Sequence, residues 1–197
     1  MTPRSLQLAL GLLLLTVSTG AAAHPDHETA GFLSALLHPL TGLDHLLAMI
    51  AVGLWAGLRA STGGARLKSL LVLPGGFVAG SALGTLLGFA GLFGPSVELT
   101  LAASLLPLGL LLALRQADAG LAAAGLVLGC GALHGAAHGT ELAGQGSMQI
   151  LCGFLLGTAM LHVAGLLLAR SLPKSLRGSA SVAVGVGLAG TGLFLLA

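Results

Sequence analysis

The sequence predicts an all-α membrane protein, a bundle of six transmembrane helices that follows a cleaved signal peptide. Two observations lead to this fold class. Apolar residues make up 55% of the chain and charged residues only 7%, whereas a soluble domain typically carries about 25% charged residues. Apolar runs long enough to cross a lipid bilayer, about 17 to 25 residues each, recur along the whole chain. An ordinary water-soluble domain is therefore excluded.

The first 23 residues have the layout of a secretory signal peptide. Arg4 lies in a short amino-terminal region, an apolar run follows at 6–17, and Ala21-x-Ala23 suits cleavage by signal peptidase. We therefore expect residues 1–23 to be removed and residues 24–197 to form a single transmembrane domain. The alternative is that residues 1–23 stay attached as an uncleaved first helix. The orientation of the next helix in the membrane would be the same in that case.

Six apolar runs follow, and each is predicted to form one transmembrane helix. They lie at 32–58, 67–92, 97–115, 119–140, 147–169 and 179–197. Lysine and arginine favour cytoplasmic loops. The mature cations all fall between spans one and two, three and four, or five and six: Arg59, Arg66, Lys68, Arg115, Arg170, Lys174 and Arg177. We therefore expect both mature termini to lie on the outer, periplasmic side of the membrane.

Glycine recurs at every fourth position in two of the predicted spans. These glycines are Gly76, Gly80, Gly84 and Gly88 in the second span, and Gly131, Gly135 and Gly139 in the fourth. In lipid, small residues allow helices to approach closely, so the stripes predict a tight bundle. They leave open whether the bundle forms a homo-oligomer. Cys130 and Cys152 lie in apolar helices and are interpreted as packing residues.

Two polar clusters lie within these apolar runs, where ionisable groups are costly and usually functional. Their members are His38, Asp44 and His45 in the first span, and His134, His138 and Glu141 at the end of the fourth. The second cluster has i, i+4 and i+7 spacing, which places all three side chains on one helix face. This spacing is typical of metal ligands. The same topology puts both clusters in the outer half of the membrane.

The spacing of the first cluster gives a less direct prediction. On a straight helix, His38 and His45 would lie on one face about 10 Å apart, which is too far for one ion to bind both easily. An ion would bind Asp44 and His45 together with ligands from neighbouring helices, or His38 if Pro39 opens the start of the helix.

Three further histidines belong to the predicted metal-binding set. His162 lies deeper, in the fifth span, although taken alone it would also fit a structural hydrogen bond between helices. His24 and His27 form either a metal-collecting tip or a solvated tail at the mature amino terminus. Imidazole nitrogens with one or two carboxylates suit borderline divalent ions such as nickel, cobalt, zinc or copper.

Both clusters resemble the signature motifs of a known family. His38-x5-Asp44-His45, and Leu133-His134-Gly-Ala-Ala-His138-Gly-Thr-Glu141, are similar to the two motifs of the HupE/UreJ family of bacterial membrane proteins, which are associated with hydrogenases and ureases. The resemblance covers essentially the whole chain. Leu133 departs from the family pattern, which more often has Phe there, and this apolar exchange affects no ligand.

The resemblance implies nickel uptake across the inner membrane, with the His, Asp and Glu residues of the motifs needed for transport. Cobalt or zinc are the alternative ions, and cytoplasmic nickel chaperones of hydrogenase or urease are the implied partners. No prosthetic group is expected. The small net charge of +2 and the scattered cations argue against a nucleic-acid partner.

The sequence therefore predicts a secondary permease for a divalent transition metal and not an enzyme. It contains no G-x4-G-K-[ST] motif, so we expect no ATP hydrolysis by this chain. One alternative is an intramembrane metal-dependent hydrolase, in which His134 and His138 would hold zinc and a carboxylate would activate water. The absence of an H-E-x-x-H motif weighs against it. A second alternative is a membrane metal receptor that passes its ion to another protein without transport.

Overall fold

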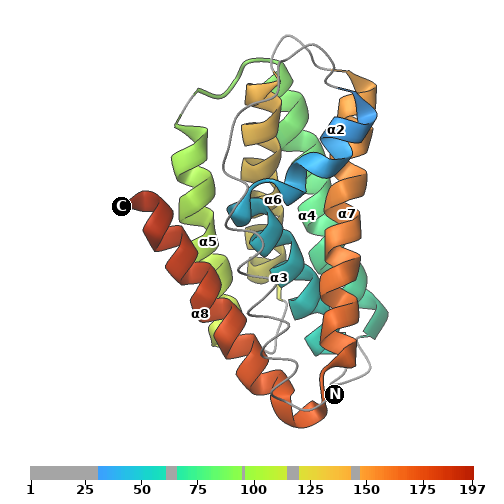
Figure 1. Ribbon diagram of the computed structural model, residues 1–197, viewed down its shortest axis with the longest axis vertical. Coiled ribbons are helices and arrows are strands. Elements are labelled where there is room, and N and C mark those ends of the chain that lie inside the picture. Colours follow the sequence, from blue (N-terminus) through green and yellow to red (C-terminus); the bar gives the residue numbers. More distant parts are fainter. Residues whose placement is uncertain (1–30, 61–65, 95, 115–119, 143–146) are drawn as a thin grey trace. The chain divides into compact units, whose positions relative to one another are not determined.

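The computed structural model describes residues 31–60, 66–94, 96–114, 120–142 and 147–197, and the regular secondary structure within these ranges is helical (Figure 1). The predicted all-α class is confirmed for this part of the chain. The signal peptide predicted at 1–23 lies outside the described residues, as do His24 and His27.

Seven α-helices and two short 3-10 helices follow one another in the described ranges. They are α2 (Phe32–Leu37), η2 (His38–Leu40), α3 (Leu43–Ala60), α4 (Arg66–Phe89), α5 (Val97–Ala113), α6 (Leu121–Glu141), α7 (Met148–Ser171), η3 (Lys174–Leu176) and α8 (Arg177–Leu196). Each of the six apolar runs that were predicted to be helical therefore contains a helix in its described residues.

The lengths of these helices support a multi-pass membrane protein. Four segments are long and apolar enough to cross a bilayer: Val72–Phe89, Leu121–Glu141, Met148–Ser171 and Lys174–Leu196. The bent pair formed by Phe32–Leu40 and Leu43–Arg59 would make a fifth span. The apolar part of α5, Leu99–Ala113, is shorter. The described residues thus support four or five spans, and the count of six stays a prediction.

The first predicted span is a broken helix and not a straight one. Its two parts meet at an angle of 81°. Pro39 has no N–H with which to continue the hydrogen bonds of α2, and the Thr41 N–H and hydroxyl both donate to the His38 carbonyl oxygen, at 2.9 and 2.7 Å. A new helix then begins, with the Gly42 carbonyl oxygen accepting the Leu46 N–H at 3.0 Å.

Helices pack in pairs, with α4 against α6, α5 against α8, and α3 against α7 (Figure 1). The two glycine stripes form the contact between α4 and α6. A Cβ atom added at Gly84 would overlap the carbonyl of Ala132, and one added at Gly135 would overlap the carbonyl of Ser81. The predicted close approach is confirmed at these positions. Gly76 makes no comparable contact, since the nearest atom to its added Cβ is 4.0 Å away.

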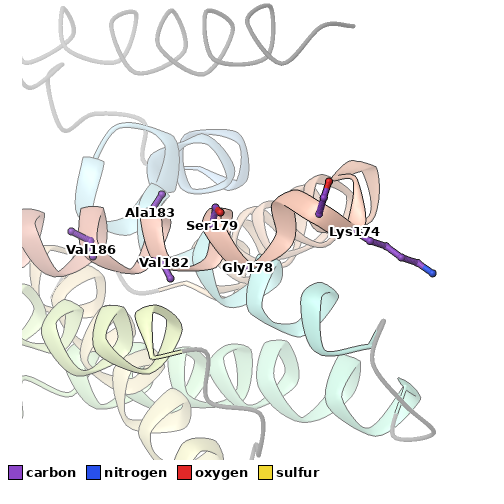
Figure 2. A pocket seen from close by; sticks show the side chains of 7 residues that line it. Lys174, Gly178, Ser179, Val182, Ala183 and Val186 are labelled. Carbon is purple, nitrogen blue, oxygen red and sulfur yellow. The ribbon is translucent and has the colours of Figure 1, made fainter.

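A surface hollow of about 730 Å³ follows the first half of α8 (Figure 2). Its lining residues are Lys174, Ser175, Gly178, Ser179, Val182, Ala183 and Val186. They are small or apolar apart from Lys174, and they include no histidine, cysteine or carboxylate. The hollow therefore lacks the ligands that a transition metal prefers, which gather between α3 and α6 instead.

Candidate metal site

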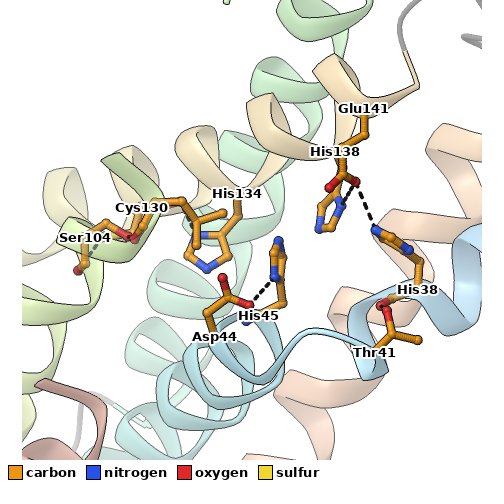
Figure 3. Close-up of polar contacts among 10 residues, drawn as sticks. His38, Thr41, Asp44, His45, Ser104, Cys130, His134, His138 and Glu141 are labelled. Carbon is orange, nitrogen blue, oxygen red and sulfur yellow. Dashed lines mark hydrogen bonds and ion pairs between the residues drawn. The ribbon is translucent and has the colours of Figure 1, made fainter. Parts of the chain in front are cut away.

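The break between α2 and α3 decides how the first polar cluster faces α6 (Figure 3). His38 lies in η2, before the break, and His45 lies in the first turn of α3, after it. Both imidazoles nevertheless contact His138, with ring centroids 4.6 Å and 4.2 Å away. The straight-helix arrangement, in which His38 and His45 stand two turns apart, is wrong. The alternative, in which Pro39 opens the start of the helix, agrees with the 81° bend, which turns both rings toward one histidine of α6.

His38, His138 and Glu141 form an outer trio around one carboxylate oxygen. Nε2 of His38 lies 3.2 Å from Oε2 of Glu141, and Nδ1 of His138 lies 3.5 Å from the same oxygen. One ligand atom from each of the three residues falls within 4.8 Å of the others, as a shared metal ion would require. The side chains of His38 and Glu141 are 42% and 45% exposed, whereas His138 is 3% exposed. The trio therefore leads from the surface into the bundle.

Asp44 and His45 form a hydrogen-bonded pair beside this trio. Oδ1 of Asp44 accepts from the His45 backbone N–H at 2.8 Å and from its Nδ1–H at 2.6 Å. An ionised carboxylate only accepts, so the ring proton resides on Nδ1 and the lone pair of the neutral ring lies on Nε2. That Nε2 is buried and has no hydrogen-bond partner. In metal sites, such a carboxylate orients the imidazole and strengthens its metal-binding nitrogen.

His134 is held in a similar way by its own helix. Its Nδ1–H donates to the Cys130 carbonyl oxygen at 2.7 Å, and its Nε2 is buried without a partner. The ring is fully buried and lies 5.3 Å from that of His45, centroid to centroid. Figure 3 shows the Asp44 carboxylate and the His134 ring facing the same space. The Cys130 thiol points elsewhere, toward the Ser104 carbonyl oxygen at 3.7 Å, as expected of a packing residue.

The structure does not bring His162 into this cluster. The residue lies in α7, its side chain is buried, and its Nδ1–H donates to the Thr158 carbonyl oxygen at 2.6 Å. Among the described residues, its ring contacts that of Phe77 in α4 and no histidine ring, with centroids 5.1 Å apart. The sequence prediction that His162 lies deeper than the motif residues agrees with this position.

Two phenylalanines were missed by sequence reasoning. Phe154 of α7 packs against His138 with ring centroids 4.4 Å apart, and Phe77 packs against His134 at 5.1 Å. Each is an apolar residue in an apolar helix, so its sequence position carries no sign that it faces imidazoles and not lipid. Only the helix packing reveals that aromatic rings flank the buried side of the site.

A cavity of about 310 Å³ opens beside the polar residues. Its lining residues are Asp44, His45, Leu99, Leu101, Ala102, Ala137, Glu141 and Leu195, which come from α3, α5, α6 and α8. The carboxylates of Asp44 and Glu141 both lie on its wall. Two negative groups in a cleft with low-dielectric walls raise the local concentration of cations, so the cavity offers a route of approach for a divalent ion.

The unpartnered imidazole nitrogens indicate the chemistry of the site. In the described residues, the buried ring nitrogens without a hydrogen-bond partner are Nε2 of His45, His134 and His162, and both ring nitrogens of His138. Buried polar atoms are normally paired, so each exception needs an explanation. The rings of His45, His134 and His138 lie close together and come from two helices, and such imidazoles suit a borderline transition-metal ion. Fold and site together define a multi-pass α-helical membrane protein with a histidine–carboxylate site.

Comparison with known proteins places the chain within this class. The family model described as HupE / UreJ protein matches residues 12–195, and the chain belongs to that family. Protein HupE of Rhizobium leguminosarum bv. viciae is 39% identical over 159 residues, which cover 80% of each chain. No solved structure matches the chain. The resemblance carried by the two sequence motifs is thereby confirmed.

Proposed function

We propose that this chain is a secondary permease that admits a divalent transition metal across the bacterial inner membrane. Nickel is the proposed ion, with cobalt as the alternative, and the imported metal serves the maturation of hydrogenase or urease through cytoplasmic nickel chaperones. One observation carries the proposal: three imidazoles, those of His38, His45 and His138, meet beside Glu141 in a bundle of membrane helices. Membership of the HupE/UreJ family supports the same assignment.

The ligand set fits a cargo that is bound and then released. Its exposed members, His38 and Glu141, suit capture of a hydrated ion, and the partly buried His45 and the buried His138 and His134 suit its transfer into the bundle. A membrane potential contributes about 2.3 kcal/mol per elementary charge per 100 mV. A divalent cation gains twice that energy, so an inside-negative membrane potential suffices to drive its entry without nucleotide hydrolysis.

The direction of the helices supports entry from the periplasm. α3 begins at the site and ends near Arg59, and α7 begins after the end of α6 that carries Glu141 and ends near Arg170. These cations therefore lie at helix ends away from the outer trio. Because arginine favours cytoplasmic loops, the outer trio is assigned to the periplasmic half of the membrane.

A metal-dependent hydrolase is a second candidate, because two histidines and a glutamate are also the ligand set of many catalytic zinc sites. Such an enzyme also needs a free carboxylate to activate water. Asp44 lines the same cavity as Glu141, but one of its oxygens already accepts two hydrogen bonds from His45. This arrangement favours a role in orienting an imidazole over a role as general base.

Uptake of radioactive nickel into liposomes that contain only the purified protein tests the proposal. We expect saturable accumulation that increases with an inside-negative potential and is lost in His138→Ala. Val163→Ala serves as the control, because Val163 is an exposed residue of α7 that belongs to neither polar cluster. Nickel binding without accumulation would overturn the permease and favour the receptor. Metal-dependent cleavage of a membrane peptide would favour the hydrolase.

A further inference from the structure

Phe77 of α4 lies between two histidines that come from different helices. Its ring centroid is 5.1 Å from that of His134 in α6 and 5.1 Å from that of His162 in α7, and the ring planes are inclined by 59° in both pairs. The phenylalanine side chain is fully buried. An apolar ring therefore bridges the deepest histidine of the motif cluster and the isolated histidine of α7.

The two histidines make the same kind of hydrogen bond. Each donates its Nδ1–H to the carbonyl oxygen four residues earlier in its own helix, at 2.7 Å for His134 and 2.6 Å for His162. A carbonyl oxygen only accepts, so the lone pair of each neutral ring lies on Nε2. Both Nε2 atoms are buried without a partner. A backbone carbonyl that fixes the tautomer of a histidine is the usual support of a metal-binding imidazole.

A purely structural role does not account for His162. Its hydrogen bond to Thr158 stays within α7 and ties no helices together. The contact between α3 and α7 at this level is made by Gly53, because a Cβ atom added there would overlap the His162 carbonyl. The helices are thus held by backbone packing, and the imidazole is left with an unused nitrogen in the interior.

The depths of the two histidines place them in sequence along the bundle. His134 lies seven residues before the end of α6 at Glu141, and His162 lies fourteen residues after the start of α7 at Met148. At 1.5 Å per residue, these separations correspond to about 10 Å and about 21 Å. Phe77 packs at the level of Gly131, one helical turn beyond His134. The order from the outer trio inward is therefore His134, Phe77 and His162.

We propose that His162 is an inner metal station and that Phe77 is the apolar barrier that separates it from the motif cluster. This inference rests on the proposed permease function. A hydrophobic constriction excludes water and hydrated ions, so an ion passes only by leaving the His134 lone pair for that of His162. The barrier keeps the bundle closed to protons and to weakly bound ions, while nickel crosses in two steps.

The first experiment compares nickel binding with nickel uptake in His162→Ala. Because the outer ligands remain, equilibrium dialysis with radioactive nickel should give wild-type affinity at the outer site, whereas uptake into liposomes should fall by about tenfold or more. The lipid-facing Val163→Ala should match the wild type in both measurements. Wild-type uptake in His162→Ala would overturn the inference, and so would the loss of binding together with uptake in a protein that retains its helical content.

The second experiment tests the barrier with Phe77→Ala and Phe77→Leu. Leucine keeps the position apolar and bulky, so Phe77→Leu liposomes should stay tight to protons, as reported by an enclosed pH dye. Alanine should let protons leak while nickel binding is retained. A Phe77→Ala protein as proton-tight as the wild type would overturn the barrier. A wild-type protein that binds nickel but transports none would overturn the permease itself. That result is distinct from a failure of the inner station or the barrier, which only the His162→Ala and Phe77→Ala variants test.

Discussion

Nε2 of His38 lies 3.2 Å from Oε2 of Glu141, although 103 positions of sequence separate the two residues. His138 approaches the same oxygen from α6, with Nδ1 3.5 Å away. One carboxylate oxygen thus lies between imidazoles from two helices. Because His38 belongs to the segment before the 81° bend, this arrangement depends on the broken first span as much as on the second motif.

Removing the charge of Glu141 should weaken nickel binding while the fold is preserved. Glu141→Gln keeps the shape of the side chain but replaces a charged partner of His38 and His138 with a neutral one. Interactions with a charged group are worth about 1.5–3 kcal/mol, so we expect nickel affinity to fall by roughly tenfold or more. Equilibrium dialysis measures the change. The control is Thr140→Ala, because the Thr140 hydroxyl donates only within its own helix, to the Ala136 carbonyl oxygen. Equal nickel affinity in the two variants would contradict the role of the outer trio.

Asp44 is expected to act through His45. In Asp44→Ala the oxygen that accepts the Nδ1–H of His45 at 2.6 Å is lost, so the ring is no longer held with its Nε2 lone pair inward. Losing such a partner typically costs 10- to 100-fold in metal affinity or activity, and we expect a loss of about that size in nickel uptake. Leu43→Ala, an exposed neighbour, should transport normally. Unchanged accumulation in Asp44→Ala and His45→Ala at normal protein levels would refute the assignment of this pair.

Much of the fold could be predicted from the sequence, because the lipid bilayer constrains the length and polarity of the helices that cross it. Each long helix falls on an apolar run of membrane length, and the glycine period of span four predicted the close approach that Gly135 makes to Ser81. The bend in span one was only partly foreseeable. Pro39 marks where the hydrogen bonds of α2 fail, but the direction of the next helix depends on packing against α7 and α4.

The site was predicted as a set of residues and not as an arrangement. Spacing identified His134, His138 and Glu141 as one helix face, yet it could not show that His38 and His45 both reach His138. Those contacts join segments far apart in sequence, and the helix spacing says nothing about them. Nothing in the sequence marked Phe77 as part of the site, because an apolar residue is expected in a membrane helix whether it faces lipid or imidazole.

Alanine at Gly135 should destabilise the bundle. Its Cβ atom would overlap the Ser81 carbonyl, and a backbone atom has little freedom to move aside. Overpacking of this kind costs about 1–3 kcal/mol, which should lower the thermal unfolding midpoint in detergent. Gly129→Ala in the same helix is the matched control, since no atom lies within 4 Å of its added Cβ. Equal midpoints would show that α4 and α6 are not held at this distance.

The proposed sidedness can be measured without reference to metal. In a Cys130→Ser, Cys152→Ser background, a cysteine at Ser147 should react with an impermeant thiol reagent added to intact spheroplasts. A cysteine at Lys174 should react only after the membrane is opened, because positive residues mark the cytoplasmic side. The reverse pattern would place the outer trio in the cytoplasmic half and would turn the uptake model into one of export or internal sensing.

Gly42, which immediately precedes α3, should control metal affinity more than stability. A Cβ atom there would lie 2.7 Å from Nδ1 of His45 and 2.9 Å from Oδ1 of Asp44. Atoms at the ends of side chains can move, so Gly42→Ala should fold normally but displace the hydrogen bond that joins this pair. The orienting carboxylate would then no longer hold the imidazole, and nickel affinity should fall by about tenfold.

Gly94→Ala is the control for this prediction, because nothing lies within 4 Å of the added Cβ at that position. Nickel affinity by dialysis and thermal midpoint should be measured on the same preparations. A fall in affinity with an unchanged midpoint is the expected result, since Gly135→Ala meets backbone while Gly42→Ala meets only the Asp44–His45 pair. Wild-type affinity in Gly42→Ala would mean that the pair tolerates displacement, and the orienting role assigned to Asp44 would have to be abandoned.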